Sequence, residues 1–242
     1  MKIFLTVILL FSVTSQSFSQ TFKELNDSLG QYYKSGEYNK GVIIGEKAVI
    51  AAKKEFGEFH PDYATSLNNL ALLYNMTGQN VKAVSLYIEA IGIRKKALGE
   101  THPYYGQSLN NLAVLYKSIG QFAKAEPLYI EAMGITRNIM GETHPDYAIS
   151  LNNLAVLYGQ MGQYAKAELL YIEAMGIWKK ALGETHPDYA TSLNNLAVLY
   201  YTMKEYAKAK PLFIEAMGIR KKALGGTHPI YAVSLDNLAG LY

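Results

Sequence analysis

The 242-residue sequence contains no cysteine, and its charge is close to balanced. Without cysteine, disulfides, thiolate metal ligands and a cysteine nucleophile are excluded within these residues. The 23 lysines and arginines and the 20 acidic residues give a formal net charge of +3, and the basic residues form no single long run. Nothing in this composition demands a nucleic acid or an acidic membrane as a partner. Because no glycine-rich phosphate loop, nucleophile elbow or base–nucleophile pair is present, we expect no catalysis and no cofactor.

Histidine is scarce too, but its five copies are regularly spaced. Each lies 42 residues after the previous one, and each is followed by proline. A fixed period of this size is typical of a tandem array of one supersecondary unit, in which each unit contacts only its neighbours. The histidines are His60, His102, His144, His186 and His228.

The regular histidines also suggest a metal site, which geometry disfavours. Packed helices lie about 8–10 Å apart, whereas zinc holds its nitrogen ligands at about 2.0–2.1 Å. Equivalent histidines of neighbouring units therefore cannot share one ion, and no cysteine or carboxylate cluster completes a site around a single histidine. We predict a structural role where a loop enters a helix, and no metal.

One unit is predicted to form two helices joined by a short turn. Pro145 suits the first turn of a helix, and Gly162 suits the left-handed residue that ends it. A second helix is predicted over residues 164–181, ended by Gly183. A link this short makes the two helices an antiparallel hairpin. The apolar positions are Leu151, Leu154, Ala155 and Tyr158 in the first helix and Ala167, Leu170, Tyr171, Ala174 and Ile177 in the second.

The order large–small–aromatic, followed by small–aromatic–small, matches the tetratricopeptide signature. The period would also fit HEAT or armadillo units, but this internal pattern favours the tetratricopeptide repeat. The blocks LNNLAVLY, GQYAKAE and KKALGETHPDYA resemble the repeats of kinesin light chains and the arrays of many bacterial multidomain proteins. Leu151 and Lys179 depart from the tryptophan and the closing proline of the signature, and losing that proline allows a longer second helix. The resemblance implies an all-α, right-handed superhelical solenoid of antiparallel helix pairs, a scaffold used for many partners.

The first residues have the layout of a secretory signal peptide. Lys2 precedes the apolar run 3–11, and small residues at Ser17 and Ser19 predict cleavage before Gln20. The apolar run is too short to span a bilayer, so we expect export to the periplasm or the exterior without stable membrane insertion; an uncleaved anchor is the alternative. The predicted organisation is a signal peptide at 1–19, a degenerate capping repeat at 20–59, four tandem units at 60–228 and the first helix of an incomplete repeat at 229–242.

The final predicted helix carries Leu235, Leu238 and Leu241 on one stripe with no following helix to cover it. A repeat array normally closes with a polar-faced cap. The sequence therefore predicts either that these residues are the front part of a longer protein or that the uncapped helix mediates self-association.

In arrays of this kind the first helix of each pair lines the inner face, where a protein or peptide can bind. An asparagine amide can both donate to and accept from an extended peptide backbone. A ladder of equivalent asparagines, ending in Asp236, is predicted on this face. The alternative is that these residues only stabilise the stacking of adjacent hairpins. We expect that stacking role of the asparagines that follow them: Asn69, Asn111, Asn153, Asn195 and Asn237. Among the other residues predicted here, Lys117 is the one clear cation, which disfavours a clamp for a carboxylate tail. The candidate partner-binding residues are Asn68, Asn110, Asn152, Asn194, Gln107, Lys117 and Gln160.

Two features of the second helices complete the predictions. The basic runs beginning at Arg94, Lys179 and Arg220 are interpreted as solvated cations near helix C-termini, offset by nearby glutamates. The glycines inside these helices, such as Gly176, are predicted to permit close packing or a bend. The favoured function is an exported interaction scaffold. The alternative, implied only by the resemblance, is the regulatory segment of a caspase-like peptidase whose catalytic domain lies beyond residue 242.

Overall fold

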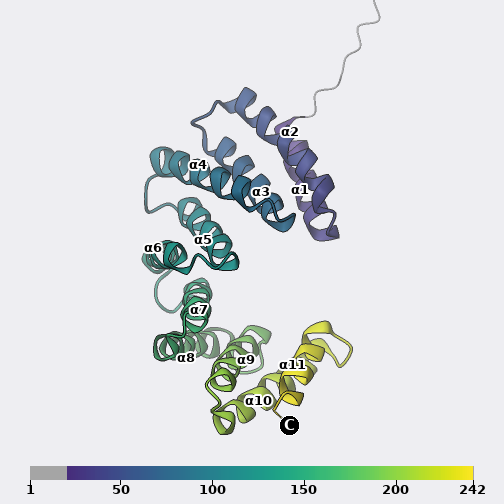
Figure 1. The fold of residues 1–242 in the computed structure, drawn as a ribbon, viewed down its shortest axis with the longest axis vertical. Coiled ribbons are helices and arrows are strands. Elements are labelled where there is room, and N and C mark those ends of the chain that lie inside the picture. The colour runs from purple at the N-terminus through teal and green to yellow at the C-terminus, as the bar shows by residue number, and fades with distance from the viewer. Residues whose placement is uncertain (1–20, 242) are drawn as a thin grey trace, which may run out of the picture.

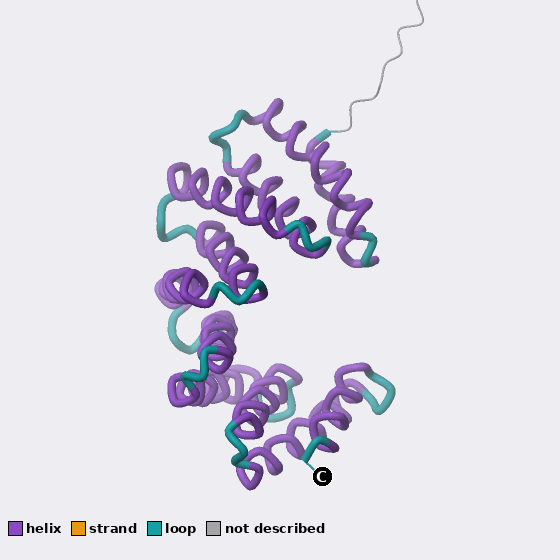
Figure 2. Tube along the Cα trace, viewed as in Figure 1, coloured by secondary structure: helices purple, strands orange, loops and turns teal. Residues whose placement is uncertain are grey.

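The computed structural model describes residues 21–241, in which all regular structure is α-helical (Figures 1 and 2). The predicted signal peptide and its cleavage site lie outside the described residues. The helices are α1 (Phe22–Ser35), α2 (Tyr38–Phe56), α3 (Pro61–Met76), α4 (Asn80–Leu98), α5 (Pro103–Ser118), α6 (Phe122–Met140), α7 (Pro145–Gln160), α8 (Tyr164–Leu182), α9 (Pro187–Thr202), α10 (Tyr206–Leu224) and α11 (Pro229–Ala239).

The His-Pro pairs start the first helix of each hairpin from α3 onward. His144 precedes α7 in an extended conformation, and its Nδ1 accepts a hydrogen bond from the backbone N–H of Asp146 at 3.1 Å. Pro145 takes the first helical position, where its missing N–H needs no partner. The same arrangement recurs at the other histidines. The predicted structural role at the loop-to-helix junction is confirmed.

Glycine ends most of the first helices, as predicted. Gly162 follows α7 with φ of +73°, and the next N–H, that of Gln163, donates to the carbonyl of Tyr158 at 2.9 Å. This closure satisfies a carbonyl that the helix leaves unpaired. Lys204 takes the corresponding place after α9 with φ of +63°, a conformation that residues other than glycine adopt only at a cost in free energy.

Small residues let the helices approach one another closely. Ala155 of α7 and Ala167 and Ala174 of α8 are completely buried, and Tyr158 and Tyr171 fill the space around them. Each helix packs mainly against its neighbours in the chain, and α3 also touches α1 and α5. The chain is therefore a continuous stack of hairpins.

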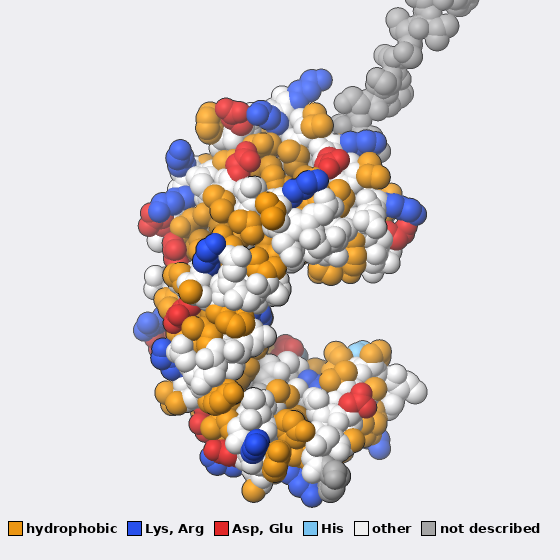
Figure 3. All heavy atoms as spheres, viewed as in Figure 1, with side chains coloured by type: hydrophobic (Ala, Val, Ile, Leu, Met, Phe, Trp, Pro, Cys, Tyr) orange, Lys and Arg blue, Asp and Glu red, His pale blue; other side chains and the backbone are white. Residues whose placement is uncertain are grey.

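The hairpins follow a curved path, so the molecule is an arc (Figures 1 and 2), and the space-filling view shows an open hollow on its inner side (Figure 3). Helices α4 and α6 lie on the outer side, whereas α5, α7 and α9 lie nearer the hollow (Figure 1). The space-filling view shows that many charged side chains gather along the outer edge (Figure 3). None of the described helices is long and apolar enough to cross a bilayer.

The glycines inside α4, α6, α8 and α10 do not serve close packing. A Cβ added at Gly176 would meet no heavy atom within 4 Å, and the same holds for Gly92, Gly134 and Gly218. The close-packing interpretation is therefore wrong.

The predicted offset of cations by glutamates is confirmed at the helix ends, where Lys95 pairs with Glu100 and Lys179 with Glu184, both at 2.7 Å.

Candidate partner-binding groove

The asparagines of the predicted ladder join consecutive hairpins. Asn153 Nδ2 donates to Asn110 Oδ1 at 3.1 Å, and Asn195 Nδ2 donates to Asn152 Oδ1 at 2.8 Å. The neighbouring asparagines thus make the stacking bonds expected of them, and the ladder asparagines accept those bonds. The same pairing joins Asn69 to Asn26, Asn111 to Asn68 and Asn237 to Asn194.

Burial separates the ladder asparagines into two groups. Asn68 and Asn194 are only 5% and 7% exposed, so the structure places them beneath the groove rather than open to it. The buried arginine of the adjoining second helix lies against each of them: Arg220 Nη1 is 3.5 Å from Asn194 Oδ1, and Arg94 donates to Ser108, whose hydroxyl donates to Asn68 Oδ1 at 3.4 Å. Asn110 and Asn152 are half-buried. For these two, partner binding stays a prediction.

The other predicted groove residues are spread along the array. Gln107 is exposed and lies at one cavity with Asn110, whereas Gln160 is exposed and lines a separate cavity between α7, α8 and α9. Lys117 is half-buried, and burial lowers the pKa of its ammonium group. The structure therefore does not gather the predicted residues into one site.

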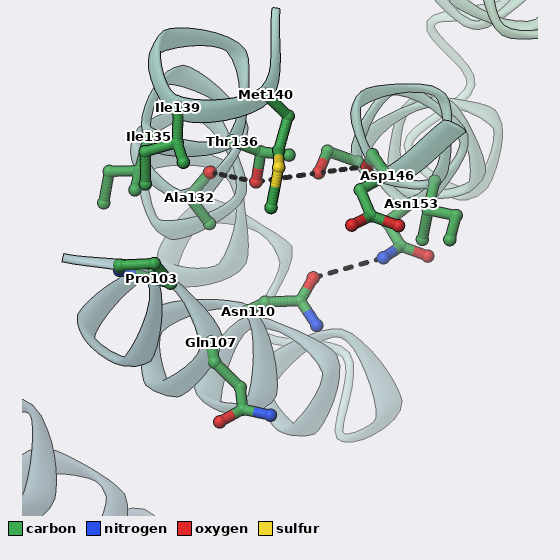
Figure 4. A pocket seen from close by; sticks show the side chains of 13 residues that line it. Pro103, Gln107, Asn110, Ala132, Ile135, Thr136, Ile139, Met140, Asp146 and Asn153 are labelled. Atoms are coloured by element: carbon green, nitrogen blue, oxygen red, sulfur yellow. Dashed lines mark hydrogen bonds between the residues drawn. The ribbon is translucent and has the colours of Figure 1, made fainter. Parts of the chain in front are cut away.

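One cavity, of about 360 Å³, opens between α5, α6 and α7 and is called here the central cavity (Figure 4). Thr136 lies on its α6 side and Asp146 and Asn153 on its α7 side, with Asn110 on α5 (Figure 4). The hydroxyl of Ser150 donates to the carbonyl of Asp146 at 3.1 Å. The lining residues are Pro103, Gly106, Gln107, Asn110, Ala132, Ile135, Thr136, Ile139, Met140, Asp146, Ile149, Ser150 and Asn153.

The central cavity forms where the repeat departs from its own pattern. Thr136 stands where the other full repeats have Arg94, Trp178 and Arg220, so a large side chain is missing. Gly106 stands where the others have alanine, and an added Cβ would meet the Ile135 side chain at 3.3 Å. Sequence reasoning missed Thr136 and its neighbours on α6, although comparing the repeats at their fixed period would have shown both departures.

The interpretation of Arg94 and Arg220 as solvated cations is wrong. Their side chains are 2% and 5% exposed, because each points inward from its second helix to the next first helix. Burial lowers the pKa of both guanidinium groups. Neither forms an ion pair within the described residues, and the Nε of each is buried without a hydrogen-bond partner.

The described residues contain no cluster of histidine, cysteine, aspartate or glutamate that could hold a metal ion.

A continuous stack of helical hairpins with a lined hollow defines the class of helical-repeat scaffolds, which bind proteins or peptides and are not catalytic. Within that class, the family model of the tetratricopeptide repeat matches residues 29–96, 76–134, 108–180 and 160–222. The chain belongs to the tetratricopeptide-repeat family.

Solved structures agree with this assignment. One is a protein of Podosopora anserina described as a kinesin light chain with nearly identical TPR-like repeats. Its sequence is 27% identical and its TM-score is 0.74, and the alignment covers 84% of this chain and 96% of that one. BtubC (BKLC) from P. vanneervenii is also 27% identical, with a TM-score of 0.73 and coverage of 86% and 82%. The apo form of RapI shares the fold alone, at 15% identity and a TM-score of 0.70, with coverage of 90% and 83%. No curated protein matches the chain.

Proposed function

We propose that this chain is an exported scaffold that binds a peptide or a partner domain in the hollow of its repeat array. The observation that carries the proposal is the central cavity, which opens between α5, α6 and α7 where the repeats depart from their common pattern. Its lining combines apolar side chains with amide and hydroxyl groups, the mixture expected where a few polar groups orient a bound segment.

The charge and the exposed apolar side chains of the predicted groove favour binding of a segment that is not strongly acidic. Lys117 is the one cation among the predicted groove residues, and it has no second cation beside it in that set. Ile149 and Val198 are 49% and 41% exposed on the first helices α7 and α9. A mildly apolar peptide with backbone groups for Asn110 and Asn152 suits this surface.

Binding is tested by selecting peptides from a random displayed library against the purified protein and measuring their affinities by fluorescence anisotropy. We expect the double variant Gln107→Ala, Asn152→Ala to weaken selected peptides about tenfold, the effect of losing one or two hydrogen bonds. Leu169→Ser is the control, because Leu169 is 70% exposed on the second helix α8 and lines no cavity described above. Affinities unchanged in the groove variant, or lost equally in the control, would contradict the proposal.

Export is supported by the charged start, apolar run and small residues of positions 2–19. The test is to fractionate cells that express the full gene and to sequence the N-terminus of the product. The expected product begins at Gln20 and is found outside the cytoplasm, whereas an uncleaved cytoplasmic product would refute export.

A further inference from the structure

The buried arginines show what fits beside the first helices. Arg94 Nη1 donates to the carbonyl of Tyr104 at 2.8 Å and to Ser108 Oγ at 2.7 Å, while Nη2 donates to Thr65 Oγ1 at 3.1 Å. The Arg94 guanidinium carbon lies 5.3 Å from the centre of the Tyr104 ring. The guanidinium therefore occupies a slot bounded by two consecutive first helices.

Arg220, three periods later, occupies the equivalent slot. Its Nη1 donates to Ser234 Oγ at 2.8 Å and lies 3.5 Å from Asn194 Oδ1, and its Nη2 donates to Thr191 Oγ1 at 3.4 Å. Two independent repeats thus place a guanidinium against the same set of positions. We call this place the arginine slot.

In the middle of the array the arginine slot is the central cavity. The positions that contact the two arginines correspond here to Gln107, Asn110, Asp146 and Ser150, and all four line the cavity. The residue that would fill it from within the chain is Thr136, whose hydroxyl instead donates to the carbonyl of Ala132 at 3.1 Å. The hydrogen-bond acceptors of the arginine slot are therefore retained in the central cavity, whereas the arginine is replaced by Thr136.

The central cavity also has a negative charge that the two arginine-filled slots lack. Asp146 is equivalent to Tyr104 beside Arg94 and to Ile230 in the repeat that follows Arg220, so neither arginine-filled slot has a carboxylate at this position. The Asp146 carboxylate forms no ion pair with a lysine or arginine of the described residues, and the Nδ1 of His144 lies 3.7 Å from it. A guanidinium entering the cavity would gain a charge-assisted hydrogen bond that the internal ones do not have.

The cavity wall suits the rest of an arginine side chain. Ile135 and Met140 from α6 and Ile149 from α7 provide apolar contact for the three methylene groups of the stem. An indole matches less well, although Trp178 fills the slot in the following repeat. An indole has one donor, and the Nε1 of Trp178 is itself buried without a partner, whereas the cavity presents several acceptors.

We propose that the central cavity binds an arginine side chain of the partner, which completes the slot that Arg94 and Arg220 fill within the chain. This inference rests on the proposed function, because it names the anchor residue of the segment held in the hollow. The stem lies along Ile135 and Ile149, and the guanidinium pairs with Asp146 and Ser150.

The test uses a small probe and no partner. N-acetyl-arginine amide is titrated into the protein with labelled isoleucine methyl groups, and shifts are followed by NMR. We expect saturable shifts at the methyls of Ile135, Ile139 and Ile149, and binding about tenfold weaker for the citrulline analogue, which has the same shape without the charge. Binding by the lysine or tryptophan amide as tight as that of the arginine amide would overturn the proposal.

Two variants locate the probe. Asp146→Asn should weaken it about tenfold, whereas Asp188→Asn, the equivalent change beside the slot filled by Trp178, should leave it unchanged. Thr136→Arg should abolish binding by filling the slot, with Thr136→Val as the control that leaves it open. Unchanged binding in Asp146→Asn, or equal loss in Asp188→Asn, would refute the site even if Thr136→Arg failed to fold.

The outcome separates the two proposals. If selected peptides depend on the groove but the arginine amide does not bind, the arginine anchor is wrong and the scaffold function stands. If the arginine amide binds at the cavity while no peptide depends on the groove, the slot is real and the proposed function is wrong.

Discussion

Lys204 is the only residue other than glycine with positive φ in the described part of the chain. Four preceding hairpins have glycine at this place, with φ between +73° and +76°. The left-handed conformation costs an L-residue about 1–2 kcal/mol because its Cβ approaches the carbonyl oxygen. The local strain is therefore concentrated in the turn between α9 and α10.

Replacing Lys204 by glycine should raise the free energy of unfolding by about 1 kcal/mol by removing this strain. Gly162→Lys, the reverse exchange one period earlier, should lower it by a similar amount. Urea denaturation followed by circular dichroism measures both changes. Equal effects of the same sign would show that the backbone conformation is not the cause.

Gly176 offers a second substitution at a single residue. It lies in the interior of α8, where glycine costs roughly 1 kcal/mol relative to alanine, and an added Cβ would meet open space. Gly176→Ala should therefore raise the free energy of unfolding by about that amount. In Gly183→Ala, the matched control, φ of +86° makes alanine destabilising. A destabilising Gly176→Ala would show that this glycine has a packing or bending role.

At the scale of one element, the histidine before each first helix acts as its N-cap. The Nδ1 of His144 satisfies one of the N–H groups that the start of α7 leaves unpaired. The preceding loop and Pro145 fix the direction in which α7 leaves the turn. These local interactions define the start of the helix independently of the distant repeats.

His144→Ala should lower the free energy of unfolding by about 0.5–2 kcal/mol, the usual cost of losing an N-cap acceptor. His144→Asn should retain most of the stability, because an asparagine oxygen can accept the same bond. Thermal unfolding of the two variants beside the unchanged protein provides the measurement. An asparagine variant as unstable as the alanine variant would rule out capping as the main role of His144.

At the scale of the whole molecule, buried tyrosines connect the hairpins. Tyr74 donates to Glu46 at 2.6 Å and Tyr200 to Glu168 at 2.6 Å, and burial is the main reason that the pKa of each phenol is raised to about 12. Burial also raises the pKa of Tyr158, which is equivalent to these two, and of tyrosines at two other positions of the repeat: Tyr63, Tyr105, Tyr147 and Tyr189, and Tyr87, Tyr129 and Tyr171.

The array should therefore unfold cooperatively at alkaline pH. The unfolded phenols ionise near pH 10, while the folded ones keep their protons to about pH 12 at Tyr74 and Tyr200. The unfolded state thus binds fewer protons in this window, so stability is full below pH 10 and falls as the pH rises toward 12. Tyrosinate absorbance and helical circular dichroism should change together. Complete ionisation with the helices intact would contradict this expectation.

Local patterns in the sequence predicted the repeat, both helices of a unit and their stops. His144, Pro145 and Gly162 act on neighbouring backbone groups, and small and aromatic residues recur at the spacing of one helical face. The predicted second helix differs from α8 by one residue at its C-terminal end, at Leu182. Such features are readable because their physical causes lie within a few residues.

The candidate site was only partly predictable. Gln107 and Asn110 were identified from their place on the first helix, but the inward course of Arg94 and the cavity at Thr136 depend on how a second helix crosses to the next hairpin. The sequence by itself determined the repeating unit, because helix starts, stops and faces follow from local backbone chemistry. The tertiary structure alone decided which long side chains are buried between hairpins and where one is missing, because that space is enclosed by three helices.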